Sequence, residues 1–488
     1  MKKNIRNSII YYPVYCLLAM TLLACNKQLD INDNPARLTK EQVSLAGLLA
    51  ATIEYTDSTF FNVGQYGNYY PQYFAGSAGQ EANIDSYNPY GFDNIWRSAY
   101  LNAMPNLKEL IERSEAQGAS QYAGIGKLLM ALNLMQATDI WGDLPYSEAF
   151  QGAANLSPRY DPQEQIYMVH LKGLLDGAIA DLQKPLPESA TLRVGTSDHI
   201  YKGAIANWLK AAYATRARYY LHLTEKDASN YQNAANDAAL AFDDKTGALD
   251  LQLRYTTDRP SPWFTFLGNT VQASKHARPS TYFINLLNGT FYPGLPDPRI
   301  SKFVDNAGAA TYVGRPVGSL GNENGANLAN TDITANTYYG ARTAVVPIIT
   351  YSEVQFIRAE ALLNSNRGEA YTAYRNGIEG SLLKLGVTEP ALSNYLNDPR
   401  IAVGAANLTL SNIMLQKYIA LFMQMETWTD LRRHEYSTSI YPGFAPPFRN
   451  LLGSGFVQRA KYADNEPGRN INVPRIPDQA QKIWLFTN

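Results

Sequence analysis

Cysteine and histidine are scarce in this chain of 488 residues, which contains two cysteines and five histidines. Cys16 lies in an apolar N-terminal segment that we expect to be removed, so the mature chain would keep Cys25 alone. A single cysteine cannot form an internal disulfide or a cysteine-based zinc cluster. The histidines are scattered and form no HExxH motif. We therefore expect no metal ion and no other cofactor.

An excess of charge of either sign is also missing. Lysine and arginine number 42, and aspartate and glutamate number 43. Three of the basic residues, Lys2, Lys3 and Arg6, belong to the leader, so the mature chain would carry 39 basic residues against 43 acidic ones. Nucleic-acid binding requires a clustered basic surface. The composition therefore excludes a nucleic-acid partner.

Catalytic motifs are absent as well. The sequence has no GxSxG nucleophile turn, no P-loop and no GxGxxG dinucleotide loop. A carboxylate pair for glycoside hydrolysis has no recognisable spacing in sequence, because its separation of about 5–9.5 Å is a property of the fold. We expect a protein that is not an enzyme, and a surface glycosidase is the alternative.

One acidic segment has the spacing of a calcium loop. Asp30 to Asn34 supply oxygen ligands at alternate places, and Glu41 stands at the twelfth place. The sixth place, however, is Pro35 where the loop needs glycine for a sharp turn. Proline holds φ near about −65° and cannot make that turn. The sequence therefore does not predict a calcium site here.

The first residues have the pattern of a lipoprotein leader. A basic start is followed by an apolar run from Val14 to Ala24 that is too short for a permanent membrane span, and Cys25 comes directly after it. We predict a signal peptide over 1–24, lipidation at Cys25 and a polar tether over 25–38. Buried acyl chains contribute about 0.8 kcal/mol per methylene, so such an anchor holds a domain at a membrane. An ordinary secretory peptide with an incidental cysteine is the alternative.

Residues 39–488 are predicted to form one mostly α-helical domain. Thr39 and Gln42 form a capping box for the first helix, and apolar residues recur with the helical period in most later segments. Several helices come in consecutive pairs with small residues on their faces, which indicates an irregular tetratricopeptide-like helix-turn-helix scaffold. We expect helices over about 40–57, 92–115, 119–139, 162–184, 201–223, 227–243, 279–288, 351–365, 368–385 and 409–434.

Two long excursions interrupt this helical pattern. Residues 58–91 and 244–349 are rich in glycine, proline, asparagine and aromatics, and ordered loops of this length are usually functional. Tyrosine rings on loops suit sugar faces, because a ring stacks on C–H bonds while neighbouring amides bond hydroxyls. A satellite hydrophobic cluster under a loop is the alternative. The candidate ligand-binding residues are Tyr66, Tyr69, Tyr70, Tyr73, Phe74, Trp263, Tyr292, Tyr338 and Tyr339.

Six strings in order along the chain carry a resemblance to a known family. They are LDINDNP at 29–35, TDIWGDLPYSEAF at 138–150, DPRI at 297–300, YSEVQFIRAEAL at 351–362, QKYIALFMQMETWTDLRRHEY at 416–436 and NVPRIPDQAQ at 472–481. Together the strings resemble the SusD/RagB family of Bacteroidetes outer-membrane lipoproteins, and most closely its SusD-like second subfamily.

The resemblance implies a helical fold of four tetratricopeptide-like units and a position on the outer membrane, facing outward. It also implies capture of nutrient glycans for a SusC-like TonB-dependent transporter. Oligopeptide capture, as in some members, and a structural lid without its own ligand are the alternatives. Because no acid stands between Cys25 and Asp30, the periplasmic leaflet remains an alternative location.

Overall fold

A computed structural model describes residues 42–269 and 276–487 of the chain. The predicted leader, Cys25, the tether, the calcium-like spacing and Thr39 of the predicted capping box lie outside these residues. Within the described ranges, the first helix begins at Leu45, where the hydroxyl of Ser44 accepts a hydrogen bond of 3.1 Å from the amide of Gly47. A serine at this position satisfies one of the free amides of the first turn.

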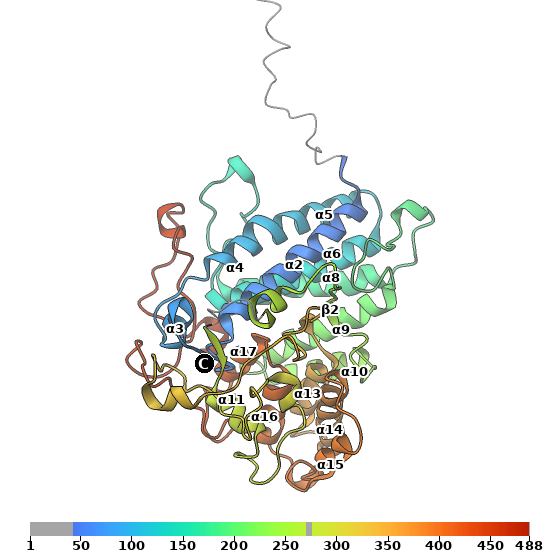
Figure 1. The fold of residues 1–488 in the computed structure, drawn as a ribbon. Coiled ribbons are helices and arrows are strands. Elements are labelled where there is room, and N and C mark those ends of the chain that lie inside the picture. The colour runs from blue at the N-terminus through green and yellow to red at the C-terminus, as the bar shows by residue number, and fades with distance from the viewer. Residues whose placement is uncertain (1–41, 270–275, 488) are drawn as a thin grey trace, which may run out of the picture.

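Helices dominate the described residues, as the periodicity predicts (Figure 1). The α-helices are α2 (Leu45–Gly67), α3 (Gly79–Asp85), α4 (Asp93–Arg97), α5 (Met104–Ala116), α6 (Ser120–Trp141), α7 (Gln163–Gln165), α8 (Lys172–Gln183), α9 (Ile205–His222), α10 (Asn230–Leu240), α11 (Thr281–Leu287), α12 (Ile300–Phe303), α13 (Tyr351–Leu362), α14 (Arg367–Lys384), α15 (Ala391–Asn397), α16 (Leu410–Ala420) and α17 (Glu426–Arg433).

Shorter helical segments and two small sheets complete the described elements. The π-helices are η2 (Ser98–Ala103), η4 (Ile166–Leu171) and η6 (Phe264–Gly268), and the 3₁₀ turns are η3 (Gly152–Ala154), η5 (Ala190–Leu192), η7 (Glu323–Leu328), η8 (Ala405–Asn407), η9 (Glu466–Gly468) and η10 (Trp484–Phe486). Strand β1 (Phe74–Gly76) pairs antiparallel with β3 (Ala277–Pro279), and β2 (Leu251–Leu253) pairs antiparallel with β4 (Val346–Ile349).

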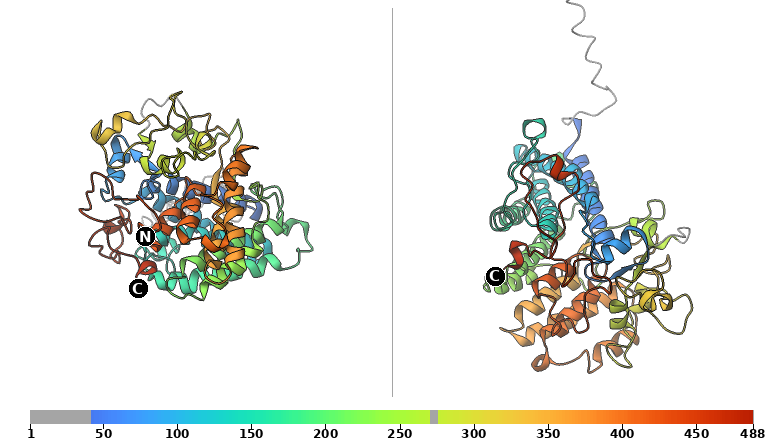
Figure 2. Two further views of the ribbon diagram at one scale, coloured as in Figure 1. Left: turned by 90° about the horizontal axis from the view of Figure 1, so that it is seen from below. Right: turned by 90° about the vertical axis from the view of Figure 1, so that its left-hand side faces the viewer.

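The helices stack as pairs in chain order, which confirms the predicted scaffold. α6 packs on α8, α9 on α10 and α13 on α14. Contacts of α8 with α9, and of α10 with α13, join one pair to the next. In Figure 1, α5, α6 and α8 lie in the upper part of the molecule and α13 to α16 in the lower part. The segment 244–349 and helix α3 lie together on one side of this helical array (Figure 2).

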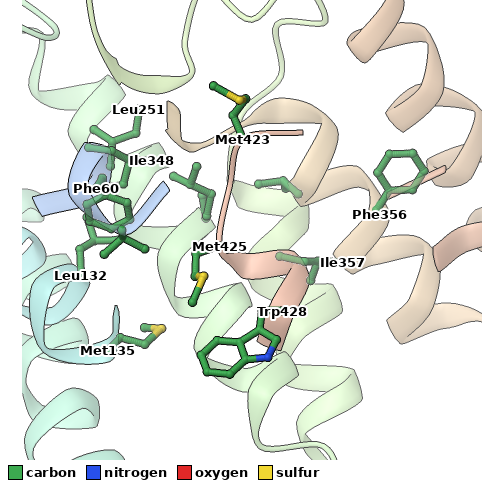
Figure 3. Close-up of a cluster of buried hydrophobic side chains, with 14 of the residues drawn as sticks. Phe60, Leu132, Met135, Leu251, Ile348, Phe356, Ile357, Met423, Met425 and Trp428 are labelled. Atoms are coloured by element: carbon green, nitrogen blue, oxygen red, sulfur yellow. The ribbon is translucent and has the colours of Figure 1, made fainter. Parts of the chain in front are cut away.

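The core runs continuously between the helices and the small sheets. Phe60 of α2 and Leu132 of α6 meet Leu251 of β2 and Ile348 of β4 (Figure 3). Each of these four side chains is buried. Since removing apolar area from water is the main favourable contribution to folding, this cluster fixes α2 against the strands that begin and end the second excursion.

Buried ion pairs connect the helices that form the lower half. Arg218 of α9 binds Glu353 of α13 with Nε–Oε1 at 2.6 Å and Nη2–Oε2 at 2.7 Å. Lys417 of α16 binds Asp430 of α17 at 2.7 Å. The guanidinium of Arg432 lies over the ring of Trp428, 3.6 Å from its centroid. Both partners of each pair are buried, so losing one would leave an uncompensated charge.

Two predicted boundaries are wrong. The first helix does not end near residue 57 but runs to Gly67, because Phe60, Val63 and Gly64 continue its buried face. The predicted helix over 409–434 is two helices, and Met423 in the break between them has a left-handed φ of 75°. A left-handed residue cannot continue a right-handed helix.

Candidate functional site

A groove of about 550 Å³ lies where the two predicted excursions meet. One wall is a face of α2, and the other is the segment that follows β2 and leads into η6. Partly exposed rings and polar groups share the lining, which is the composition of a small-molecule site. The lining residues are Asp57, Ser58, Phe61, Gln65, Tyr255, Pro260, Pro262, Thr265 and Phe266.

Asp57 is the buried polar group of this groove. Its side chain is 2% exposed, and its Oδ2 accepts a hydrogen bond from the hydroxyl of Tyr255. Its Oδ1 has no hydrogen-bond partner among the described residues. Burial raises the pKa of Asp57 to about 7, and the bond from Tyr255 only partly opposes this effect. A buried carboxyl with a shifted pKa in a cleft is a typical feature of a functional site.

Charged residues at the edge of the groove are paired with one another. Arg259 binds Glu54, and Oε1 of Glu54 lies 2.8 Å from Nδ1 of His199. The guanidinium of Arg259 lies over the ring of Tyr255, 5.0 Å from its centroid. These contacts hold Tyr255 in the position from which it donates to Asp57. Arg259 therefore orders the edge of the groove, and the carboxylate of Glu54 neutralises its positive charge.

Trp263 supports the groove from behind. Its side chain is 1% exposed and contacts Phe61 edge-on, with the ring centroids 4.8 Å apart. Gly64 makes this contact possible, since a Cβ at that position would lie 2.8 Å from Cζ2 of Trp263. Its indole Nε1 has no partner among the described residues. The prediction that Trp263 contacts ligand directly is wrong for this conformation, because the ring is covered.

The predicted tyrosine cluster after α2 is a core cluster. Tyr69, Tyr70, Tyr73 and Phe74 are each at most 1% exposed, so the expectation that they form an exposed sugar platform is wrong. Tyr70 packs on Trp428 at 4.9 Å between ring centroids, and Tyr73 packs on Phe422 at 5.2 Å. The segment turns inward after Gly67, and β1 then pairs with β3. The hydrophobic-cluster alternative is therefore confirmed for these four rings.

The remaining predicted rings do not line the groove either. Tyr339 is 2% exposed and is covered, which contradicts a contact with ligand. Tyr66, Tyr292 and Tyr338 are partly exposed but are not among the lining residues. Tyr66 packs on Tyr90 with centroids 5.6 Å apart, and Tyr338 packs on Tyr339 at 5.0 Å. Each of these three rings is partly buried and packs against the hydrophobic core.

A second cleft, of about 450 Å³, lies in the C-terminal segment around Tyr462, Asn470 and Arg475. None of its lining residues has a buried polar atom without a partner, as far as the described ranges show. One lining residue, Ile471, is 92% exposed. The groove on α2 is the better candidate, because it combines partly exposed rings with an unsatisfied buried carboxyl.

Four residues that line the groove were not predicted from the sequence, namely Asp57, Phe61, Tyr255 and Phe266. A signal for Asp57 is present in the helical pattern, because Asp57 stands four residues after Ile53 and three before Phe60. That spacing places a carboxyl on the buried face of α2. Phe61 and Phe266 carry no such signal, since their exposure is decided by how the segment after β2 lies on α2.

Comparison with known proteins identifies the family. Residues 35–447 match the second SusD-like family, which is described as starch-binding associating with outer membrane. This chain belongs to that SusD-like family. Among curated proteins, no match to the sequence is found.

Solved SusD-like structures share the fold. A SusD/RagB family protein of Bacteroides thetaiotaomicron is 24% identical with a TM-score of 0.73, and the match covers 91% of this chain and 99% of that one. A chitin-binding SusD homologue of Flavobacterium johnsoniae is 20% identical with a TM-score of 0.72, over 91% and 99%. A Bacteroides ovatus homologue is 22% identical with a TM-score of 0.71, over 91% and 99%. The mostly α-helical, tetratricopeptide-like SusD architecture is thus confirmed for this chain.

Two absences in residues 42–269 and 276–487 concern membranes and metal ions. No helix there combines the length and the apolar character that crossing a bilayer would require. No group of three or more metal-binding side chains comes together in these residues.

Proposed function

We propose that this SusD-like protein is a lipid-anchored binding protein of the outer membrane, exposed outward, that captures nutrient glycans in the groove on α2. We propose that it delivers them to a SusC-like TonB-dependent transporter and has no catalytic activity of its own. The observation that carries the proposal is the groove, where Phe61 and Phe266 flank a buried carboxyl. Family membership and the chitin-binding relative support a carbohydrate as the ligand.

The arrangement of the groove suits a sugar ring. Phe61 and Phe266 offer faces on which the C–H bonds of a pyranose can stack, and Gln65 and Ser58 offer hydrogen-bonding groups beside them. Pro260 and Pro262 restrict the backbone of the opposite wall. A wall that is already ordered loses little conformational freedom when ligand binds.

Titration of the protein, purified from membranes in detergent, against a polysaccharide panel and a tryptic peptide digest tests the ligand class. We expect binding to at least one glycan and no release of reducing ends during prolonged incubation. Binding to peptides alone would replace the glycan assignment by oligopeptide capture. Reducing ends released from a bound glycan would instead show an enzyme.

Replacing Phe61 by alanine tests the site. We expect glycan affinity to fall by about tenfold, since one stacking contact contributes on the order of 1 kcal/mol. Phe448 is the matched control, because it is 63% exposed and does not line the groove. Phe448→Ala should leave affinity unchanged. Equal affinity of the wild type and Phe61→Ala would place the ligand elsewhere.

A further inference from the structure

Two neighbouring loops carry the two most exposed large apolar side chains of the described residues. Ile471 is 92% exposed and Leu156 is 77% exposed. The loops are fastened together, because the side-chain amides of Asn470 and Asn472 donate to backbone carbonyls of the loop that holds Leu156, each at 2.8 Å. A single exposed leucine is ordinary on a protein surface. Two aliphatic tips held side by side indicate a surface that meets an apolar partner.

The tips of the two loops contain no ionisable side chain. They are residues 151–158 and 470–474. Placing them in an apolar layer therefore removes no charge from water, which would be the costly step. Arg469 and Arg475 stand directly before and after the second tip, and both are exposed. Neither arginine makes an ion pair within the part of the chain that the structure describes, so their charges are free to meet anionic headgroups.

A third exposed leucine lies beside the point where the chain enters the described structure. Near the end of α5, Arg113 donates to the carbonyl of Val43 at 2.7 Å. At the start of α6, one short turn later, Gln121 donates to the carbonyl of Pro185 at 3.2 Å. The next residue, Leu186, is 55% exposed. The same pair of helix ends thus holds both the beginning of the described chain and the loop of Leu186.

These loops project at one end of the molecule. Figure 1 places the blue start of α2 and the loops that contain η3, η5 and η9 in the upper part of the molecule. The right-hand view of Figure 2 agrees for the start of α2, the teal loop of η3 and the red loop of η9. Leu156 follows η3 and Ile471 follows η9. The exposed aliphatic side chains are therefore at the end from which the predicted tether leaves.

We propose that Leu156, Leu186 and Ile471 insert into the lipid surface to which the protein is anchored, with the two arginines beside Ile471 at its headgroups. This inference rests on the lipid anchor proposed above, for which Cys25 is the predicted site. An anchor alone does not orient the domain, because residues 26–41 can span up to about 60 Å when fully extended. Contacts on three loops fix which side of the domain faces the membrane.

A lipid surface fits these tips better than a protein surface does. Protein interfaces are centred on packed aromatic and arginine side chains, and the tips 151–158 and 470–474 contain no aromatic ring. A bilayer accepts separate aliphatic side chains without a matching shape. Three such side chains bury far less apolar area than acyl chains do, so they orient the domain but do not hold it at the membrane by themselves.

This orientation also places the groove. α2 begins at the end that faces the membrane, and an α-helix rises 1.5 Å per residue, so Phe61 lies about 24 Å along the helix axis from Leu45. With the three loops at the headgroups, the groove is held away from the membrane surface. A domain that tilted freely on its tether would not keep this separation.

Fluorescence quenching by lipid tests the contact. Acylation would use the thiol of Cys25, so a cysteine introduced into the mature chain is the only one left to label. Leu156→Cys, Leu186→Cys and Ile471→Cys variants of the full-length protein are labelled with a small dye and reconstituted in vesicles of phosphatidylcholine and phosphatidylglycerol that contain nitroxide-labelled lipid. We expect each dye to lose most of its fluorescence, at a depth of about 5–10 Å into the boundary between headgroups and acyl chains.

Leu240→Cys is the matched control. Leu240 is a leucine with the same exposed fraction as Leu186, 55%. It lies on α10, which Figure 1 places below α8 and α9. Its dye should keep its fluorescence. Replacing phosphatidylglycerol by phosphatidylcholine should weaken the quenching at position 471 more than at position 186, because arginines flank only the first. An equal effect at both positions would overturn the role of the arginines.

The outcomes separate this inference from the proposed function. If the labelled protein attaches to the vesicles but none of the three dyes is quenched, the lipid contact is overturned and the anchor stands. Quenching of the Leu240→Cys dye to the same extent overturns the fixed orientation. Dyes that are shielded from water in native membranes but escape the lipid quencher assign the tips to a protein partner instead. A protein that does not attach to vesicles at all overturns the proposed anchor, and this inference with it.

Discussion

At the scale of single residues, Asp57 shows how one buried carboxyl can lower the stability of a fold. Its neighbours on the buried face of α2, Ile53 and Phe60, are apolar, and only the hydroxyl of Tyr255 bonds its carboxyl. The hydroxyl of Tyr255 compensates the negative charge of Asp57 less than a bound cation would. The ionised state therefore costs free energy in the folded protein that it does not cost in the unfolded chain.

Asp57→Asn should stabilise the protein in a pH-dependent way. The pKa of Asp57 is raised from 3.8 to about 7, so the cost of ionisation in the fold is absent below about pH 4 and complete above about pH 7. We expect the variant to gain up to about 4 kcal/mol in unfolding free energy at pH 8 and almost nothing at pH 4. Urea unfolding at both pH values measures this difference. A gain of the same size at both would show that ionisation of Asp57 is not its cause.

At the scale of secondary-structure elements, close helix contacts depend on glycine at particular positions. α13 and α14 are joined by a short turn and pack along their length, with Phe356 of α13 fully buried between them. A Cβ at Gly377 would lie 2.9 Å from two atoms of the Phe356 ring. The absence of a side chain at this position sets how closely the two helices approach.

Gly377→Ala should therefore destabilise the protein by roughly 1–3 kcal/mol, because overpacking outweighs the better helix propensity of alanine. Gly368 is a matched control in the same helix, since the nearest atom to its Cβ would be 3.7 Å away. Gly368→Ala should be neutral or stabilising by up to about 1 kcal/mol. Chemical denaturation of the two variants compares them. A destabilisation of equal size in both would point to the helix backbone and not to Phe356.

Helices could be predicted from the sequence where the apolar period is regular. Ile125, Leu128, Leu129 and Leu132 lie at i, i+3, i+4 and i+7, and all four are buried in α6. The break after α16 could not be predicted, because Met423 favours helix and its left-handed backbone is imposed by packing. Similarly, the residues around Tyr73 in the sequence do not show whether its ring faces solvent or packs on Phe422. Long-range contacts decide that difference.

At the scale of the whole molecule, buried charges join helices that are far apart in sequence. His222 of α9 lies 2.7 Å from Oε1 of Glu426 in α17 and 3.5 Å from Oδ2 of Asp139 in α6. Burial alone would lower the pKa of His222, but the carboxylates of Glu426 and Asp139 outweigh it and raise the pKa. The imidazole of His222 thus links α9 to α6 and α17.

His222→Gln should reduce stability most at acid pH. A histidine with a raised folded pKa contributes stability that is complete below its unfolded pKa of about 6.5 and is lost as the pH rises through the folded value. We expect the difference in melting temperature between wild type and variant to be larger at pH 5.5 than at pH 9. His170→Gln, at a partly exposed position, is the control for the substitution itself. A constant difference across this range would contradict the ion link.

The proposed lipid anchor would determine where the whole chain is located. If Cys25 is acylated, Cys25→Ser should move the protein from the membrane fraction to the soluble fraction while its melting temperature stays the same, because the acyl chains insert into the bilayer. Fractionation with immunodetection measures this change. A variant that stays with the membrane would point to retention by a partner protein or by an uncleaved leader.

The pairing of β1 with β3 has a consequence for exchanging segments between relatives. Phe74 is opposite Pro279 and Gly76 is opposite Ala277, so the ends of two distant segments are fastened together beside the helices. A mutation that lengthened or shortened one segment alone would lose this register. A laboratory graft from a relative would therefore have to exchange both segments as a unit, and one that transplants only one of them should leave a misfolded sheet on an intact helical frame.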